Sequence, residues 1–236
     1  MVRPARRPDT REIAYTEERW RTLERLRGIA ESIMRPLEDA GLSPVVHGSL
    51  ARGDVDEKSD VDVFVPSEVS SYRIELALER AGFVPLRREI VMATPWQLPK
   101  AHITIDEGRS VTFPLIRPSA LEFEFYRFGG AVSLPELERG LRVPGVDKRL
   151  MLIEPTPRGH LESPVMGREA EVARKVGVSI DIVRERVQVL TRRAEVGHTG
   201  IFLQRELAPD EGFEEVFDRL LRERPAMRLR LKKRPP

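Results

Sequence analysis

The sequence contains no cysteine among its 236 residues, which excludes a disulfide framework and a thiolate metal site within this chain. Aromatic residues make up only 6%, and the four histidines are scattered without the spacing of metal ligands. No apolar run of about 18 residues exists, so we expect no membrane span. The N-terminus, MVRPARRPDTR, lacks the apolar stretch of a signal peptide. These absences together predict an intracellular, cytoplasmic protein.

Charged residues, in contrast, form 33% of the chain, and their distribution is uneven. Residues 147–236 carry 19 basic and 15 acidic side chains, whereas the formal net charge of the whole chain is +2. Arginine far outnumbers lysine, which is typical of a heat-adapted surface with ion-pair networks. A polyanionic partner such as DNA or RNA is one prediction for the C-terminal half. A solvated basic tail over residues 219–236 is the alternative.

The apolar spacing and the turn signals predict the elements along the chain. Residues 1–12 are expected to be disordered, and helices are expected over residues 16–40, 71–81, 167–190 and 210–224. Strands are expected over residues 43–46, 60–65, 88–94 and 121–126, with a hairpin over 102–116 and a two-stranded ribbon over 191–207. We therefore predict an α/β fold: a mixed-sheet domain over 1–130, a connector with one strand over 131–165, and a third domain over 166–236.

The stretch HGSLARGDVDEKSDVDVFV, residues 47–65, carries the clearest functional signal. Asp60 and Asp62 lie two residues apart in an apolar strand, so both carboxylates project from the same face. Adjacent carboxylates repel each other unless a cation lies between them, and Mg²⁺ prefers such ligands. Gly48 and Ser49 precede a possible helical turn, whose free N–H groups would face an anion. Arg52 would neutralise charge nearby, so the stretch predicts a metal–triphosphate site.

Gly-Ser, a spacer with Arg-Gly, and Ser-Asp-x-Asp in an apolar strand resemble the signature of the polymerase-β-like nucleotidyltransferase superfamily. The segments EFYRFGG (124–130) and VPGVDKRLMLIEP (143–155) are similar to an archaeal group of nucleotidyltransferases known from sequence. The superfamily resemblance implies in-line attack of a hydroxyl on the α-phosphate of a nucleoside triphosphate, with pyrophosphate leaving. It implies that Asp60 and Asp62 bind Mg²⁺ or Mn²⁺, and that Gly48 and Ser49 hold the β- and γ-phosphates.

The resemblance also implies a third carboxylate on a later strand, and its place in this chain is open. The hairpin's second strand, SVTFPLI, has Thr112 near the expected position. Glu122 and Glu124, on one face of the next expected strand, are the preferred candidates, and Asp106 is another. A half-exposed strand with charged residues outward explains Glu122 and Glu124 equally well. A site that binds nucleotide without turning it over remains a further alternative. Asp54 and Asp56 form a second Asp-x-Asp, which we expect to be exposed.

Residues 171–190 resemble a helix-turn-helix, with Ala173 between the helices and Gly177 in the turn. Ser179 is expected to cap the second helix, and the following Gly-containing ribbon resembles a wing. The resemblance implies that the second helix enters the major groove and presents Ser179, Asp181, Arg184, Glu185 and Gln188. Arg184, Gln188, Arg192 and Arg193 are the predicted nucleic-acid contacts, whereas Asp181 and Glu185 would repel phosphate. Arg186 stands where an apolar residue is more usual, so a protein-contact module is equally consistent.

We therefore expect a Mg²⁺-dependent nucleotidyltransferase that transfers a nucleoside monophosphate from a nucleoside triphosphate to a hydroxyl acceptor. The alternative from another class is a non-catalytic regulator, which senses nucleotide through its N-terminal domain and binds DNA through the winged helix.

Overall fold

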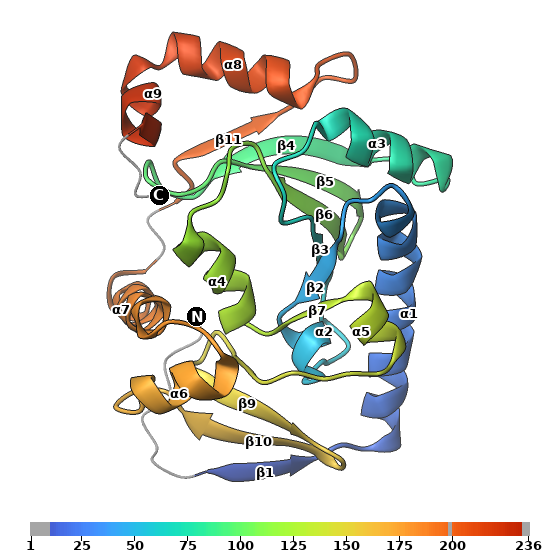
Figure 1. Cartoon of the computed structure of the whole chain (residues 1–236), viewed down its shortest axis with the longest axis vertical. Coiled ribbons are helices and arrows are strands. Elements are labelled where there is room, and N and C mark those ends of the chain that lie inside the picture. The colour runs from blue at the N-terminus through green and yellow to red at the C-terminus, as the bar shows by residue number, and fades with distance from the viewer. Residues whose placement is uncertain (1–9, 198–199, 233–236) are drawn as a thin grey trace. The chain divides into compact units, whose positions relative to one another are not determined.

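The computed structural model describes residues 10–197 and 200–232 (Figure 1). The chain folds into two compact units, each built from three separate segments. Unit 1 comprises residues 1–31, 45–61 and 121–199, and unit 2 comprises residues 32–44, 62–120 and 200–236. The division falls inside the first helix, α1 (Glu17–Asp39). The α/β fold class is confirmed.

Unit 2 contains a sheet with the strand order β11-β4-β5-β6-β3. These strands are β3 (Val61–Phe64), β4 (Arg87–Met92), β5 (Lys100–Asp106), β6 (Arg109–Pro114) and β11 (Leu203–Glu206). Its helices are α3 (Ser71–Arg80), α8 (Phe213–Glu223) and α9 (Pro225–Lys232). The predicted hairpin over 102–116 is confirmed as β5 and β6, with its turn at Glu107 and Gly108.

The two faces of the unit 2 sheet differ in chemistry, because side chains alternate along each strand. One face is apolar: Ile90, Ile103 and Val111 are buried, and Phe113 lies edge-on to Phe213 of α8, with ring centroids 5.3 Å apart. Figure 1 shows α3 and α8 on this side of the strands. The opposite face carries polar side chains, which belong to the candidate site.

Unit 1 contains a four-stranded antiparallel sheet with the order β1-β10-β9-β8 and a β2–β7 ladder. The strands are β1 (Arg11–Ala14), β2 (Val45–His47), β7 (Ala131–Ser133), β8 (Gly145–Val146), β9 (Met151–Thr156) and β10 (Gly159–Pro164). The helices, besides the start of α1, are α2 (Ser49–Arg52), α4 (Ala120–Phe128), α5 (Leu134–Glu138), α6 (Glu169–Val176) and α7 (Ile180–Val196). A core that includes Leu152, Val172 and Val183 joins the sheet to α6 and α7.

The strand predicted over residues 121–126 and the ribbon predicted over 191–207 are wrong. Residues 121–126 are helical, in α4, because Leu121, Phe125 and Phe128 pack as one helical face into the unit 1 core. The predicted wing over 191–207 is absent from its described part, because α7 continues to Val196 and β11 pairs with β4 instead. Residues 198–199 of that ribbon lie outside the described residues.

At the N-terminus, Arg11 and Glu12 are ordered in β1, although we expected disorder through residue 12. Residues 1–9 of that prediction, and 233–236 of the basic tail, lie outside the described residues. The expected connector, residues 131–165, holds β7, α5, β8, β9 and β10 rather than a single strand. Among the helices described, none is long and apolar enough to cross a membrane.

Candidate functional site

The Gly48-Ser49 turn adopts the predicted geometry. β2 ends at His47, and α2 begins at Ser49, so the predicted helical turn at Leu50 to Arg52 is confirmed. Gly48 has φ 74° and ψ −139°, a backbone conformation that favours glycine, and nothing lies within 4 Å of where a Cβ would stand. The first N–H groups of a helix have no intrahelical acceptor. The turn therefore presents backbone donors next to open space.

Hydrogen bonds to the backbone of Gly129 and Gly130 hold the glycine turn in place. The Gly48 N–H donates to the carbonyl of Gly130 at 2.9 Å, so this N–H is already used inside the protein. Arg52 is buried and donates through Nη1 to the carbonyl of Gly129 at 2.6 Å. Its Nε and Nη2 donate to the two carboxylate oxygens of Asp54 at 2.9 and 3.0 Å. Asp54 is thus half-buried and paired, so our expectation that it is exposed was wrong.

The two carboxylates of the Asp-x-Asp motif have different surroundings. Asp60 is exposed at the end of the loop, and Asp62 lies in β3, half-buried. A carboxylate oxygen of Asp62 accepts a hydrogen bond from the Ser110 hydroxyl of β6 at 2.7 Å. Asp56 is exposed, as expected, and accepts a hydrogen bond from the Lys58 N–H at 2.9 Å. No group of three or more His, Cys, Asp or Glu side chains with metal-ligand geometry occurs within residues 10–197 and 200–232.

A polar row continues from Asp62 across the sheet of unit 2. Thr112, at the place where a third acid was expected, is buried, and its Oγ1 lies 3.0 Å from Nδ1 of His102. On the far side of His102, the register places the buried Glu89 opposite it, and Glu89 accepts a hydrogen bond from Gln204 at 2.8 Å. Sequence reasoning missed His102. The signal was the alternation within the hairpin, which places His102 on the polar face opposite Thr112.

Burial lowers the pKa of His102 and is the largest influence on it. The positive charges of Lys100 and Arg87 act in the same direction, whereas the negative charges of Glu89 and Asp62 raise the pKa. The outcome is an imidazole that is neutral at pH 7.

The two preferred third acids lie on α4, and a helix separates residues i and i+2 by about 200°. The prediction that Glu122 and Glu124 share a face is therefore wrong. The Glu124 carboxylate accepts the Ser179 N–H at 3.0 Å and the Ser179 hydroxyl. Glu124 thus supports the N-terminus of α7, while the catalytic roles of both glutamates stay predictions.

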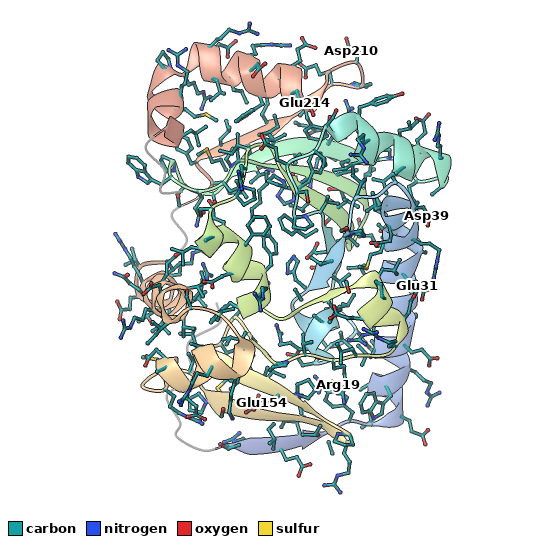
Figure 2. All side chains as sticks on the ribbon, in the orientation of Figure 1. Arg19, Glu31, Asp39, Glu154, Asp210 and Glu214 are labelled. Carbon is teal, nitrogen blue, oxygen red and sulfur yellow. The ribbon has the colours of Figure 1, made fainter. Side chains whose placement is uncertain are left out.

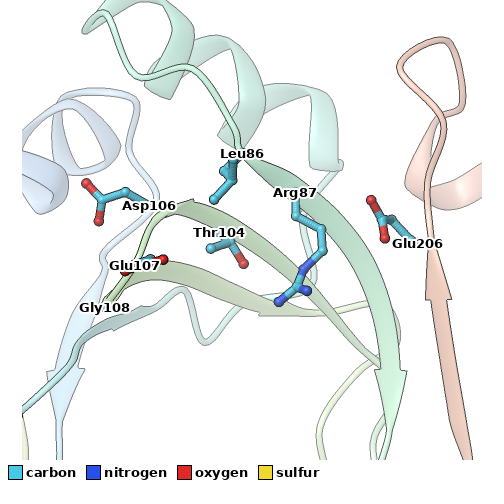
Figure 3. Close-up of a pocket in the computed structure, with 7 residues that line it drawn as sticks. All are labelled: Leu86, Arg87, Thr104, Asp106, Glu107, Gly108 and Glu206. Carbon is cyan, nitrogen blue, oxygen red and sulfur yellow. The ribbon is translucent and has the colours of Figure 1, made fainter.

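Asp106, the other candidate, lies at the tip of the hairpin and forms an ion pair with Arg109. It borders a pocket of about 510 Å³, which Figure 3 shows with Thr104 and Arg87 at its centre. The remaining lining residues are Leu86, Glu107, Gly108 and Glu206. Thr104 lies opposite Ser110 in the β5–β6 ladder, so the pocket adjoins the polar row.

The α6–α7 pair has the predicted turn. Gly177 ends α6 with φ 74°, and Ser179 caps α7 by accepting the Ile182 N–H. Arg186, the unusual residue of the motif, is buried, with its guanidinium 4.9 Å from the ring centroid of Phe125. Arg184, Gln188 and Arg192 are exposed at four-residue spacing, and Arg193 is half-buried.

Comparison with known proteins finds a partial match. Residues 26–103 match the family model described as a nucleotidyltransferase domain. No curated protein matches this chain. A solved structure described as a tRNA-processing enzyme in an apo form is similar at 20% identity, with a TM-score of 0.30. That similarity covers 52% of this chain, which spans about a third (32%) of the other protein's length. The domain match contains Gly48, Ser49, Asp60 and Asp62; it supports nucleotidyl transfer and does not favour the regulator alternative.

Proposed function

We propose that this protein is a divalent-metal-dependent nucleotidyltransferase, which transfers a nucleoside monophosphate from a nucleoside triphosphate to a hydroxyl acceptor. The observation that carries the proposal is the Gly48-Ser49 turn at the start of α2, followed by Asp60 and Asp62, all within the segment that matches a nucleotidyltransferase domain. The turn and the acids supply the two kinds of group that a metal-bound triphosphate needs.

The triphosphate would bind at the glycine turn. The open space above Gly48 lets phosphate oxygens approach the backbone, and the Ser49 N–H and hydroxyl are donors for them. Arg52 was predicted to bind nucleotide directly, but three of its nitrogen atoms already donate to Asp54 and Gly129. We propose that Arg52 acts by holding the backbone next to Gly48 in place.

The residues present fit a hard divalent cation. Asp62 keeps a carboxylate oxygen besides the one that Ser110 binds, and Asp60 is exposed two residues before it. Mg²⁺ takes one or two protein carboxylates and completes its shell with water and substrate phosphates, and Mn²⁺ accepts the same oxygen donors. When bound, such an ion stabilises negative charge on the reacting phosphate oxygens.

The third acid remains a prediction at Glu122 or Glu124. If either residue serves the transition state, its replacement by Gln lowers turnover more than nucleotide affinity. Glu124 is the weaker candidate for the third acid, since its carboxylate already accepts a hydrogen bond from Ser179. Normal turnover by both variants would remove these two residues from the mechanism.

A panel of radiolabelled substrates tests the proposed function. The full chain is incubated with each α-³²P-labelled nucleoside triphosphate and Mg²⁺, and with RNA, DNA, amino sugars, the protein itself or water as acceptor. We expect labelled product and release of pyrophosphate with at least one acceptor, and neither with the Asp60→Asn/Asp62→Asn variant. Absence of transfer and of pyrophosphate release with every combination would overturn the proposal.

We further propose that the exposed stripe of Arg184, Gln188 and Arg192 on α7 contacts nucleic acid, because residues four apart share a helix face. Arg193 is the fourth predicted contact. The interaction is consistent with the basic balance of residues 147–236.

A further inference from the structure

The polar row on the unit 2 sheet includes more groups than metal binding needs. Three hydrogen-bonded pairs follow one another across the strands: Asp62 with Ser110, His102 with Thr112, and Glu89 with Gln204. They lie on five neighbouring strands, β3, β6, β5, β4 and β11. The row therefore extends from the candidate metal ligand on β3 to the edge strand β11.

Such a row is costly to maintain. Glu89 is 8% exposed and Thr112 is 6% exposed, and a buried polar group costs free energy unless a hydrogen bond satisfies it, so each residue depends on its partner in the row. Apolar residues fill the opposite face of the same strands without this cost. A purely structural sheet would have no need of the imidazole at the centre of the row, so its chemistry suggests a use.

The imidazole of His102 has one nitrogen fixed and one available. Nδ1 lies 3.0 Å from the Thr112 hydroxyl oxygen, and Nε2 has no hydrogen-bond partner within the part of the chain that the structure describes. With Nδ1–H donating to Thr112, Nε2 carries a lone pair that accepts a proton. Burial is the largest influence and lowers the pKa of this ring, with Lys100 and Arg87 acting in the same direction and Glu89 and Asp62 against it.

Space for an acceptor lies on the same face. Thr104 follows His102 by two residues on β5, so both side chains project from one side of the sheet. Thr104 lines the pocket of about 510 Å³, and its ladder partner Ser110 binds Asp62. A molecule in this pocket would lie on the face of the sheet that carries His102 and Asp62, and Figure 3 shows Thr104 among the residues that line the pocket.

We propose that His102 is the proton acceptor of the transfer reaction, an inference that rests on the proposed function. The O–H bond of the acceptor breaks, and its proton moves to Nε2 of neutral His102. The hydroxyl oxygen forms a bond to the α-phosphorus, and the bond from that phosphorus to the bridging oxygen breaks. Pyrophosphate leaves with the electron pair. Thr112 is the positioning residue, because its hydroxyl oxygen lies 3.0 Å from Nδ1 and orients the imidazole ring.

Steady-state kinetics of the full chain test this role, with the labelled triphosphate and acceptor that give the highest turnover in the panel, water included. His102→Gln should lower kcat by about 10²- to 10⁴-fold and leave the KM for nucleotide unchanged. The wild-type rate should fall at acidic pH as His102 protonates, and this acidic limb should be absent from the His102→Gln profile. Added imidazole should restore part of the activity of His102→Ala.

Two further variants separate catalysis from structure. Thr112→Val keeps the imidazole but removes the hydrogen-bond partner that orients it, so kcat should fall about tenfold or more while the acidic limb remains. His160→Gln changes a buried histidine of unit 1, which hydrogen bonds with Tyr15, and should leave the turnover profile unchanged. Turnover of His102→Gln within twofold of wild type would overturn the role of His102 and leave the proposed function intact. No turnover by wild type would overturn the proposed function itself.

Discussion

At the scale of single residues, Asp60 and Asp62 have distinct surroundings despite their shared motif. Asp60 is exposed, whereas Asp62 is held by the Ser110 hydroxyl at 2.7 Å. A hydrogen bond to a metal-binding carboxylate fixes the direction of its free oxygen, and loss of such a partner typically lowers metal affinity 10- to 100-fold. Ser110 should therefore matter to the metal although it is not a ligand.

We predict that Ser110→Ala weakens Mn²⁺ binding by about tenfold or more, for this reason. Asp60→Asn/Asp62→Asn should abolish Mg²⁺-dependent nucleotide binding with the fold intact, since removal of like charges does not destabilise a strand. Isothermal titration with Mn²⁺, and with ATP in the presence and absence of Mg²⁺, measures both effects. Asp56→Asn, in the exposed loop, is the matched control. Unchanged nucleotide affinity in the double variant would exclude these carboxylates as metal ligands.

A second residue-scale prediction concerns pH. His160 is 3% exposed, and burial is the main cause that lowers its pKa; its Nδ1 lies 2.7 Å from the Tyr15 hydroxyl. Burial likewise raises the pKa of Tyr15 to about 12, so this phenol stays protonated. Because the unfolded histidine has a pKa of about 6.5, the unfolded chain binds more protons below that pH. The stabilisation that neutral His160 contributes is complete above pH 6.5. It is lost as the pH falls through the lower pKa of His160 in the folded protein.

Urea unfolding at a series of pH values checks this linkage. We expect the free energy of unfolding to decrease between pH 7.5 and pH 5, and this decrease should be smaller in His160→Gln. His102→Gln should also reduce it, since the pKa of His102 is lowered as well. An unchanged pH slope in both variants would show that neither histidine is buried in its neutral form.

At the scale of elements, two helices begin in the same way. In unit 1, the Ser179 N–H and hydroxyl donate to the Glu124 carboxylate; in unit 2, those of Ser71 donate to Glu214, at 2.6 and 2.7 Å (Figure 2 labels Glu214). A carboxylate at a helix N-terminus accepts otherwise unused N–H groups and interacts favourably with the helix dipole. In each unit, a glutamate of one helix thus fixes the start of another.

A double-mutant cycle measures this contact in unit 1. We predict that Ser179→Ala costs about 1 kcal/mol of stability, as for other helix caps. Glu124→Ala should cost a similar amount, and the two losses should be non-additive by about 0.5 kcal/mol or more, because the residues share hydrogen bonds. The same cycle for Ser71 and Glu214 is the comparison, with unfolding free energies from urea titration as the readout. Additive losses would mean that Glu124 does not support the cap.

Element prediction succeeded where local signals decide the structure. The Gly48-Ser49 turn, the Asp62 strand and the 102–116 hairpin depend on neighbouring residues, and all three are confirmed. The stretch LEFEFY alternates as a strand does, but Leu121, Phe125 and Phe128 also have helical spacing, and burial in the unit 1 core favours the helix. Strand β11 pairs with β4, more than 100 residues away, which no local pattern indicates.

At the scale of the whole molecule, the site was only partly predictable, because contacts between residues far apart in the sequence leave no local pattern. Asp60 and Asp62 are recognisable from spacing alone, but the groups next to them depend on which strands are neighbours. Ser110 reaches Asp62 from β6, and His102 joins the row through Thr112. Functional residues within one stretch of sequence can therefore be recognised from the sequence. Functional residues that come together from several strands are recognised only once the fold is known.

The charge distribution gives a prediction for the full chain. Duplex DNA or RNA bound through α7 should dissociate as salt rises, with log K falling by about 0.9 per phosphate contact per log unit of salt. Arg192→Ala/Arg193→Ala should make this slope shallower, and Arg21→Ala/Arg25→Ala, which removes the same charge from α1, should not. Gln188→Ala should change sequence preference and leave the slope alone. Fluorescence anisotropy at several salt concentrations is the measurement, and no binding at low salt would leave α6–α7 as a protein-contact module.

The interleaving of the two units has a consequence for biosynthesis. The chain passes between the units five times, at residues 31/32, 44/45, 61/62, 120/121 and 199/200. On the ribosome, unit 1 lacks part of its residues until position 199 has been translated, and unit 2 lacks α8 until position 223. The ribosome therefore cannot complete one unit before it begins the other, as it does with domains that follow one another along a chain. We expect nascent chains arrested before residue 199 to remain sensitive to protease, and full-length chains to acquire resistance in both units only after release.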